Sequence, residues 1–179
     1  MRELQKALPV PDGWRAAGRA ALAHLATWSN LLALVGAMAV TLVFYAPALG
    51  FAFLFDDTFD LSRVENRSYW SLLTSSEGYS YFRPIPFVIW KIIRDVFGYY
   101  PAPLLHALPL VIHALNGWLV FLLLRRLGVG WWALMPAVLF LGYPFSYQNI
   151  AIVGVMFHPL AALGVLAAVF MFAVYGGGA

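Results

Sequence analysis

The apolar residues of this chain fall into long runs on either side of one polar stretch. The first run covers residues 30–55 and holds no charged side chain before Asp56. A second run covers residues 103–124 and ends at Arg125 and Arg126. A hydrocarbon core about 30 Å thick needs about 20 helical residues to cross it. Both runs therefore predict transmembrane helices.

The segment after Arg126 contains no Asp, Glu, Lys or Arg and predicts two further spans. Residues 150–175 form a long apolar run that can cross by itself. Residues 131–141 are too few to cross unless the turn-like sequence GYPFSYQ extends them. We therefore predict a short or tilted third span over residues 129–147 and a fourth over 150–175. The expected fold class is all-α integral membrane, with about four transmembrane helices.

The polar stretch over residues 56–102 predicts an extracytoplasmic loop that contains amphipathic helices lying in the membrane interface. The sequence PIPFVIWKIIRDVF, residues 84–97, places its three charged side chains on one face of a helix. Most of its isoleucines and valines share the opposite face, as in helices that lie in the interface. A second short helix is predicted over residues 64–74.

Composition agrees with a membrane protein. The chain is 63% hydrophobic and 11% charged, with a mean hydropathy of +0.79, whereas soluble domains average about 25% charged residues. The formal net charge of +3 gives no reason to expect a nucleic-acid partner. Without cysteine the chain has neither a disulfide framework nor a thiolate metal site.

The basic residues suggest an orientation. Residues 1–29 include Arg15 and Arg19 and fit either a helix lying on the membrane surface or a basic flank that orients the first span. Both interpretations put this segment in the cytoplasm. Two crossings then return Arg125 and Arg126 to the same side, which leaves residues 56–102 outside.

Two adjacent carboxylates, Asp56 and Asp57, follow the first span directly and are the first candidate site residues. Pro47 and Gly50 predict that the helix breaks before them, which would place them in a shaped recess. Acidic residues at a membrane are costly to desolvate and suggest function. Such a pair can bind a divalent cation, or one carboxylate can deprotonate an acceptor hydroxyl while the other orients it. The simpler alternative is a solvated acidic cap for the next helix.

Arg83, in the sequence YFRPIP, is a second candidate. A guanidinium held before a proline at membrane height can bind a phosphate oxygen. Alternatively, it anchors the loop to lipid headgroups.

The second span carries a row of polar residues, His106, His113 and Asn116. The two histidines are seven residues apart, which sets them about 20° apart around a helix and about 10 Å apart along it. They are therefore too far apart to bind one metal without other elements. A polar row in a span faces protein, which favours contacts with neighbouring helices. His158 in the fourth span, just before Pro159, suggests the same role.

The order of these features resembles the N-terminal part of the GT-C superfamily of integral membrane glycosyltransferases. The elements that carry the resemblance are DD at the start of an outer loop, FRP, FGYYP, the pattern H-x6-H-x2-N, and LLRRLG. The chain is most similar to the protein O-mannosyltransferase and lipid A aminoarabinose transferase branch, and to bacterial members with a YRP motif. The resemblance covers about residues 30–175.

This resemblance implies transfer of a sugar from a polyprenyl-phosphate donor at the extracytoplasmic face of a bacterial plasma membrane. Asp56 and Asp57 match an acidic position that activates the acceptor or helps to hold a metal, either Mg²⁺ or Mn²⁺. Arg83 matches the arginine of the YRP motif, with Phe82 in place of the tyrosine.

The number of spans departs from the family, whose members have considerably more than four. A chain of 179 residues is therefore not expected to transfer a sugar by itself. An alternative is a cut-down, inactive relative that serves as a structural subunit of a larger membrane complex. Such a complex can contain cofactors or pigments, since intramembrane histidines can ligate the magnesium of a chlorophyll-type pigment. Either case predicts the lipid bilayer and further transmembrane helices or subunits as partners.

Overall fold

The computed structural model describes residues 27–76 and 82–176, apart from the side chains of Phe55, Asp56 and Tyr175, and the segment predicted over residues 1–29 lies almost wholly outside this part. The described part contains helices and no strand. In chain order these are α3 (Trp28–Tyr45), η1 (Ala46–Gly50), α4 (Phe55–Glu65), α5 (Tyr69–Thr74), α6 (Pro84–Phe97), α7 (Ala102–Arg126), η2 (Gly130–Ala133), α8 (Leu134–Leu141), α9 (Ser146–Ala151), η3 (Val153–Val155) and α10 (Phe157–Gly176). The elements labelled η are short 3₁₀ helices.

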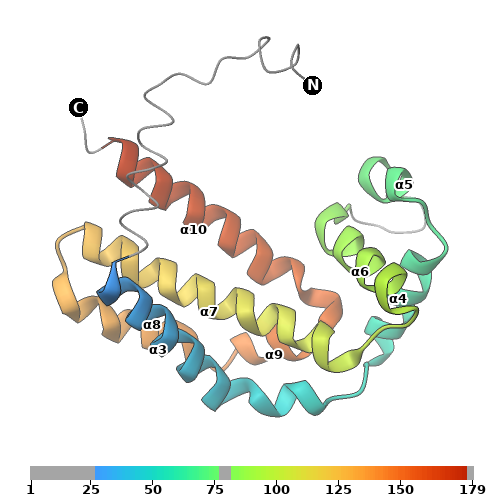
Figure 1. Cartoon of the computed structure of the whole chain (residues 1–179), viewed down its shortest axis with the longest axis horizontal. Coiled ribbons are helices and arrows are strands. Elements are labelled where there is room, and N and C mark those ends of the chain that lie inside the picture. Colours follow the sequence, from blue (N-terminus) through green and yellow to red (C-terminus); the bar gives the residue numbers. More distant parts are fainter. Residues whose placement is uncertain (1–26, 77–81, 177–179) are drawn as a thin grey trace, which may run out of the picture.

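Helix α7 is the centre of the fold. It packs against α3, α8 and α10, and Figure 1 shows it running between α10 and the pair formed by α3 and α8. In the most apolar 18-residue stretch of α7, 50% is buried inside the protein. The corresponding values are 22% for the segment formed by α3 and η1 and 17% for the segment formed by η3 and α10. The outer faces of α3 and α10 therefore present apolar side chains to their surroundings.

Three helical segments of the described chain are long and apolar enough to cross a membrane. They cover Trp28–Gly50, Ala102–Arg126 and Val153–Val174. The segment predicted as a short third span contains a shorter apolar helix, Gly130–Leu141. The chain leaves this helix just before Pro144, which cannot donate a backbone hydrogen bond, and then forms the short helix α9.

The break predicted at the end of the first span is confirmed. Helix α3 ends at Tyr45, Pro47 lies in the first turn of η1, and the chain is extended before α4 begins at Phe55. The continuous helix predicted over residues 64–74 is wrong. Helix α4 ends at Glu65, and Ser68 starts the separate helix α5, because its side chain accepts a hydrogen bond from the Ser71 amide at 3.1 Å.

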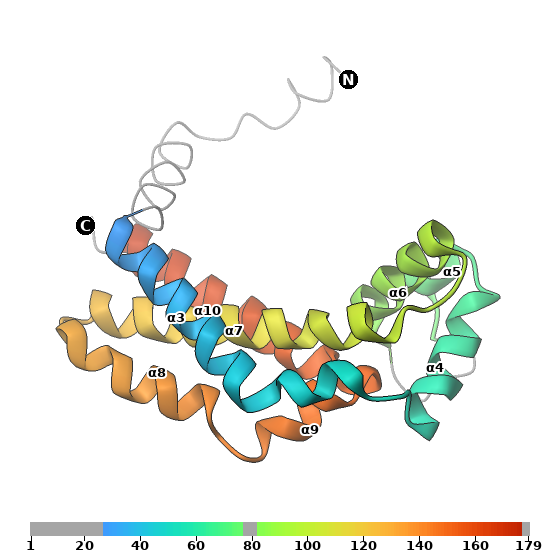
Figure 2. The same ribbon diagram turned by 60° about the horizontal axis from the view of Figure 1, so that its bottom comes forward.

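The amphipathic helix predicted over residues 84–97 is confirmed as α6, which ends at Gly98 in the left-handed conformation with φ of 76°. Phe87 and Trp90 are buried in a core shared with α4, α5 and the first half of α7. Ile85 and Val96 on another face are exposed. Figure 2 shows α4, α5 and α6 gathered beyond the start of α7, which is the end of the molecule farthest from α8.

Hydrogen bonds from side chains tie the long helices together. Tyr45 Oη donates to the Leu141 carbonyl at 2.7 Å, and His113 Nε2 lies 3.1 Å from the same oxygen. Asn116 Nδ2 donates to the Pro159 carbonyl of α10 at 2.9 Å. The polar row of α7 thus contacts the end of α8 and the start of α10.

Close packing of α7 against α8 requires glycine at position 117. A Cβ atom there would stand 2.4 Å from Leu141 Cδ2, so we expect Gly117→Ala to lower the free energy of unfolding by about 1–3 kcal/mol. Gly36→Ala is the matched control, because a Cβ at Gly36 meets nothing within 4 Å and alanine favours a helix. Thermal unfolding in detergent measures both variants, and equal midpoints would contradict this packing.

Candidate functional site

Asp57 joins two parts of the chain that lie far apart in sequence. It lies in the first turn of α4 and is completely buried. Its Oδ2 accepts a hydrogen bond from the Leu54 amide at 3.0 Å, and its Oδ1 accepts one from the Gly154 amide at 2.7 Å. Hydrogen bonds to a carboxylate are roughly twice as strong as those between neutral groups. Asp57 therefore fixes the start of α4 to η3.

Asp60 is a second buried carboxylate at this place, and the sequence analysis did not identify it. It follows Asp57 by almost one helical turn, and a Cβ atom on Gly154 would stand 3.3 Å from Asp57 Oδ1 and 3.6 Å from Asp60 Oδ2. Leu61 and Val64 share this buried face of α4. Asp57, Asp60, Leu61 and Val64 have the i, i+3, i+4, i+7 spacing of one helix face. This spacing was the signal in the sequence that could have placed Asp60 on the buried face of a helix over residues 55–65.

Arg83 approaches the same region from α6. It immediately precedes that helix, and its guanidinium carbon lies 3.4 Å from the centroid of the Phe157 ring. Phe157 begins α10, three residues after Gly154. Asp57 and Arg83 thus contact the two ends of one short segment, residues 154–157. The side chain of Asp56 is outside the described part of the chain.

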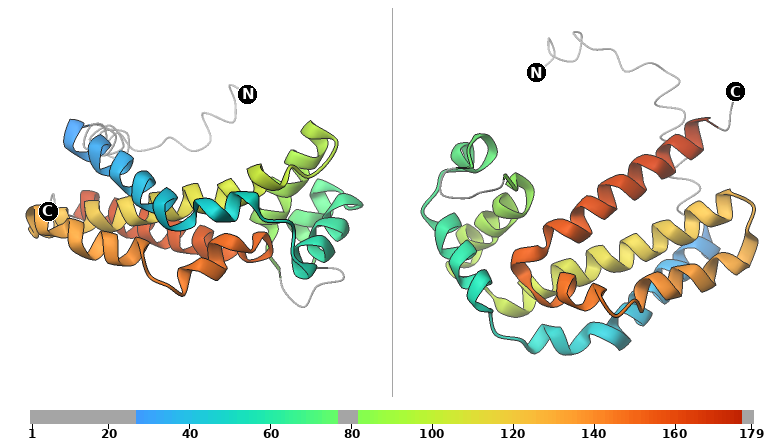
Figure 3. Two further views of the ribbon diagram at one scale, coloured as in Figure 1. Left: turned by 90° about the horizontal axis from the view of Figure 1, so that it is seen from below. Right: turned by 180° about the vertical axis from the view of Figure 1, so that it is seen from behind.

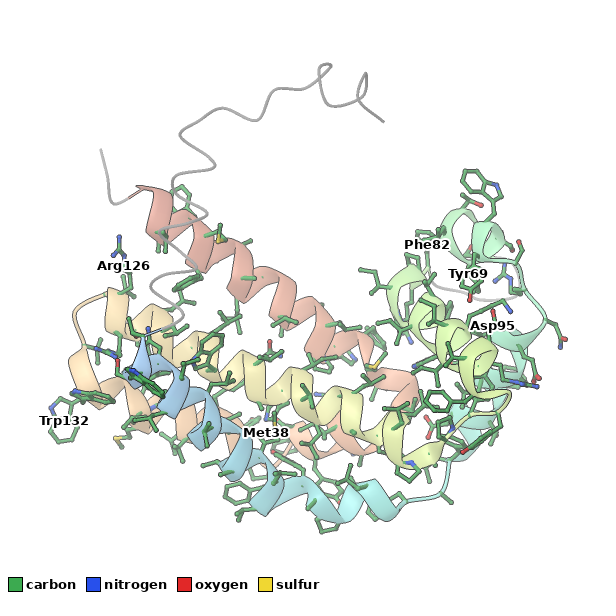
Figure 4. The ribbon with its side chains drawn as sticks, viewed as in Figure 1. Met38, Tyr69, Phe82, Asp95, Arg126 and Trp132 are labelled. Atoms are coloured by element: carbon green, nitrogen blue, oxygen red, sulfur yellow. The ribbon has the colours of Figure 1, made fainter. Side chains whose placement is uncertain are left out.

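A groove of about 390 Å³ lies between the start of α6 and the first turns of α10. Arg83 is the charged residue of its lining, and the other residues are apolar. They include Phe82, Pro84, Ile85, Leu160, Ala161 and Gly164. Figure 4 shows Phe82 at the start of α6, on the side that faces α10. The groove therefore combines a hydrocarbon-like wall with one cation.

Contacts of α4 with α6 and with the segment just after α6 hold Arg83 and Asp57 in place relative to each other. Arg94 forms an ion pair with Glu65, and Tyr100 Oη donates to the Leu61 carbonyl at 3.0 Å. Burial, which is the largest effect, and the nearby Glu65 charge raise the pKa of Tyr100 to about 12. The phenol therefore stays protonated and keeps its hydrogen bond throughout the physiological pH range.

The polar row of α7 is buried among other helices. His106 is fully buried against the rings of Phe51 and Phe53, and neither of its ring nitrogens has a hydrogen-bond partner within the described residues. His113 and Asn116 contact backbone carbonyls of α8 and α10 as described above.

His158 differs from the polar residues of α7 because it is exposed on α10. Its ring packs on Phe157, with 3.9 Å between the ring centroids. Together with His113, Asn116, Ser146 and Asn149 it lines a polar pocket of about 170 Å³.

A metal site is not assembled by the described side chains. No group of three or more His, Asp or Glu residues in residues 27–76 and 82–176 is placed to hold an ion. Both oxygens of Asp57, one of the two expected ligands, already accept amide hydrogens. The other expected ligand is Asp56, whose side chain lies outside the described part, so the Mg²⁺ or Mn²⁺ site stays a prediction and no step is derived through a metal.

Comparison with known proteins identifies no relative: no protein family model, curated protein or solved structure matches this chain. The groove, Arg83 and the buried acids are therefore the features of this chain that bear on its function. All of them lie at the end of the molecule formed by α4, α6 and the start of α10.

We expect Asp57→Asn to destabilise the fold. An asparagine keeps one oxygen acceptor, but its amide group must then face either the Leu54 or the Gly154 N–H, which leaves a buried donor unpaired. The expected loss of unfolding free energy is about 1–3 kcal/mol.

Asp95→Asn is the matched control for Asp57→Asn. Asp95 is exposed, and its partners are the Tyr69 hydroxyl and Lys91. Its replacement should change the free energy of unfolding by less than about 0.5 kcal/mol. Urea titration in detergent measures both variants, and an Asp57→Asn midpoint equal to that of the control would show that these hydrogen bonds do not stabilise the fold.

Proposed function

We propose that this chain is a membrane-embedded GT-C-like glycosyltransferase module that binds a polyprenyl-phosphate sugar in the groove between α6 and α10. The observation that supports this proposal is the chemistry of the groove. Its apolar residues suit a long hydrocarbon chain, and Arg83 suits the phosphate attached to it. A polyprenyl-phosphate sugar has both of these parts, a hydrocarbon chain and the phosphate bonded to its end.

Arg83 stabilises the leaving group in the proposed reaction. The acceptor hydroxyl oxygen attacks the anomeric carbon of the sugar, and the bond from that carbon to the phosphate oxygen breaks. Polyprenyl phosphate leaves with the electron pair, and the guanidinium of Arg83 binds the charge that develops. The contact with Phe157 holds the plane of the guanidinium beside the groove.

The two adjacent aspartates take different roles in this proposal. Asp57 is a positioning residue, because its oxygens bind the amides of Leu54 and Gly154 and thereby set the segment that carries Phe157. Asp56 accepts the proton of the acceptor hydroxyl, as a general base. The carboxylate of Asp60 lies with that of Asp57 beside the backbone of Gly154.

The proposal places the protein in a bacterial plasma membrane, with a cytoplasmic N-terminus and four spans, of which the third is short. Helices α4, α5 and α6 then lie in the outer interface. Their exposed apolar residues, among them Trp70, Leu73, Ile85 and Val96, would insert between lipid headgroups. Because the third span is too short to cross by itself, further helices of a longer enzyme or of partner subunits pack beside it in this proposal.

A role as a structural subunit of a larger membrane complex is the second candidate. It is favoured by the outer faces of α3 and α10, which expose apolar residues such as Val35, Val43, Val165 and Phe172. A subunit of this kind has no need to distinguish a phosphorylated polyprenyl chain from an unphosphorylated one, so donor binding separates the two candidates.

Topology is tested by single cysteines in a chain that has none of its own. We expect Ser76→Cys to react with a membrane-impermeant maleimide in intact cells. Leu127 is an exposed position just beyond α7, and Leu127→Cys should react only after the cells are permeabilised. Labelling of both positions from the same side would refute the proposed orientation.

Donor binding is tested with a polyprenyl phosphate and the polyprenol of the same length, titrated against the detergent-solubilised protein by native mass spectrometry. We expect the phosphate to bind more tightly, and Arg83→Gln to remove about ten-fold or more of that preference. Lys91→Gln is the matched control, because Lys91 is a cation of the same helix that pairs with Asp95 and does not line the groove.

Gly164→Leu tests the apolar part of the groove. A Cβ atom at Gly164 meets nothing within 4 Å, so leucine should fill the groove without disturbing the fold and should weaken binding of both compounds. Equal binding of phosphate and alcohol by the wild-type protein would argue against the transferase and for the structural subunit.

A further inference from the structure

A second groove lies on another side of α7, where α3 and α8 cross it. Figures 2 and 3 show these two helices beside α7, toward the end of the molecule that lies away from α4–α6. The groove has a volume of about 330 Å³. Apolar residues line its length, among them Leu32, Val40, Ala137 and Val138. Gly36 also lines it and has open space where a side chain would stand.

Arg125 stands at one end of this groove. Its Nη1 donates to Ser29 Oγ at 3.3 Å and to Asn30 Oδ1 at 3.1 Å. Its guanidinium carbon lies 5.6 Å from the ring centroid of Phe121 and 4.8 Å from that of Trp131. Ser29, Phe121 and Trp131 all belong to the groove lining, so the guanidinium of Arg125 lies directly behind three lining residues at this end of the groove.

The charge at this end is not balanced by the described protein. All acidic residues of the described part fall between Asp56 and Asp95. Figure 4 shows Asp95 and Arg126 at opposite ends of the molecule. The hydrogen-bond partners of Arg125 are neutral, and Arg126 donates to the Ala173 carbonyl. Since no acid of the described residues lies at this end, a ligand with a negative charge would find two arginines there to pair with.

Tryptophans at the same end indicate the depth of a headgroup layer. Trp28 and Trp132 are exposed by 84% and 80%, and Trp131 stacks beside Arg125. Tryptophan is enriched at the level of the lipid headgroups, where its ring is partly apolar and its N–H is polar. Arg125 and Arg126 thus lie where a lipid phosphate would be, and the groove extends from there toward the bilayer centre.

We propose that this groove is a binding site for an anionic phospholipid, with one acyl chain along α3, α7 and α8 and the phosphate at Arg125. Basic sites between transmembrane helices recognise anionic headgroups in this way. The apolar wall explains why the occupant has a hydrocarbon chain, and the two arginines, which pair with no acid of the described residues, explain why its headgroup is negative. The inference does not depend on the proposed transferase, because the groove and its cation differ from those of Arg83.

The test compares three ligands on the detergent-solubilised protein by native mass spectrometry: phosphatidylglycerol, phosphatidylcholine with the same acyl chains, and glycerol phosphate. We expect phosphatidylglycerol to bind about five-fold more tightly than phosphatidylcholine, as befits the one arginine placed at its phosphate, Arg125, and glycerol phosphate to bind far more weakly than either lipid. Equal binding of the two lipids would overturn the proposal. Binding of glycerol phosphate as tight as that of phosphatidylglycerol would show a free-phosphate site instead.

Variants separate charge from groove. Arg125→Gln should reduce phosphatidylglycerol binding to the level of phosphatidylcholine, whereas Arg125→Lys should keep the preference. Gly36→Leu, at a position with no atom within 4 Å of its Cβ, should weaken binding of both lipids while the thermal midpoint stays at or above that of the wild type. Unchanged phosphatidylglycerol binding by a folded Gly36→Leu protein would exclude the groove as the site.

The two glycine variants also serve as controls for each other. Gly36→Leu should leave polyprenyl-phosphate binding intact, and Gly164→Leu should leave phosphatidylglycerol binding intact, because the two positions line different grooves. If the protein fails to bind one of the two ligands, the result therefore does not decide whether the site for the other ligand exists. If one variant abolished both, a single site would serve both ligands and the separate phospholipid site would be refuted.

Discussion

The carbonyl group of Leu141, at the end of α8, is the constraint on which the arrangement of the long helices depends. Helix α8 ends inside the bundle, and its last carbonyls have no partner within their own helix. A buried carbonyl without a partner is costly, so other protein groups must supply one. Tyr45 and His113 do so from α3 and α7. Three features of the neighbouring helices thus converge on that one helix end. They are Tyr45 at the end of α3, His113 in α7, and Gly117, which leaves room for the Leu141 side chain.

The hydrogen bond from Gly154 to Asp57 has the same function at the other end of the bundle. Irregular backbone precedes α10, and a buried carboxylate on α4 accepts one of its amides. A residue first considered for its reactivity is thus also a structural support. Because Phe157 follows Gly154 closely and contacts Arg83, the packing of α4 determines where the cation of the groove stands. Fold and candidate site share the same few contacts.

The long apolar runs, the break near Pro47 and the amphipathic helix α6 could be predicted from the sequence because they depend on local composition and periodicity. Helix α4 could not, since the sequence left its first acids either in a recess or in a solvated cap, and the Gly154 amide that pairs with Asp57 lies 97 residues further along the chain. The short apolar run that contains α8 could be seen in the sequence, but its contacts with Tyr45 and His113 could not, because these residues are distant in sequence. Arg83 was predicted to be a cation at membrane height, but its contact with Phe157 has no local signal.

The uneven distribution of charge has an electrical consequence. In the described residues between Asp56 and Asp95, the five acids (Asp56, Asp57, Asp60, Glu65 and Asp95) are offset by five bases (Arg63, Arg67, Arg83, Lys91 and Arg94). The opposite end carries Arg125 and Arg126 with no acid beside them among the described residues. An elementary charge moved across a membrane changes in energy by about 2.3 kcal/mol per 100 mV. In the topology proposed above, a resting voltage would therefore act on the described residues mainly through the arginine pair, would favour that end on the negative side, and so would oppose inversion of the protein.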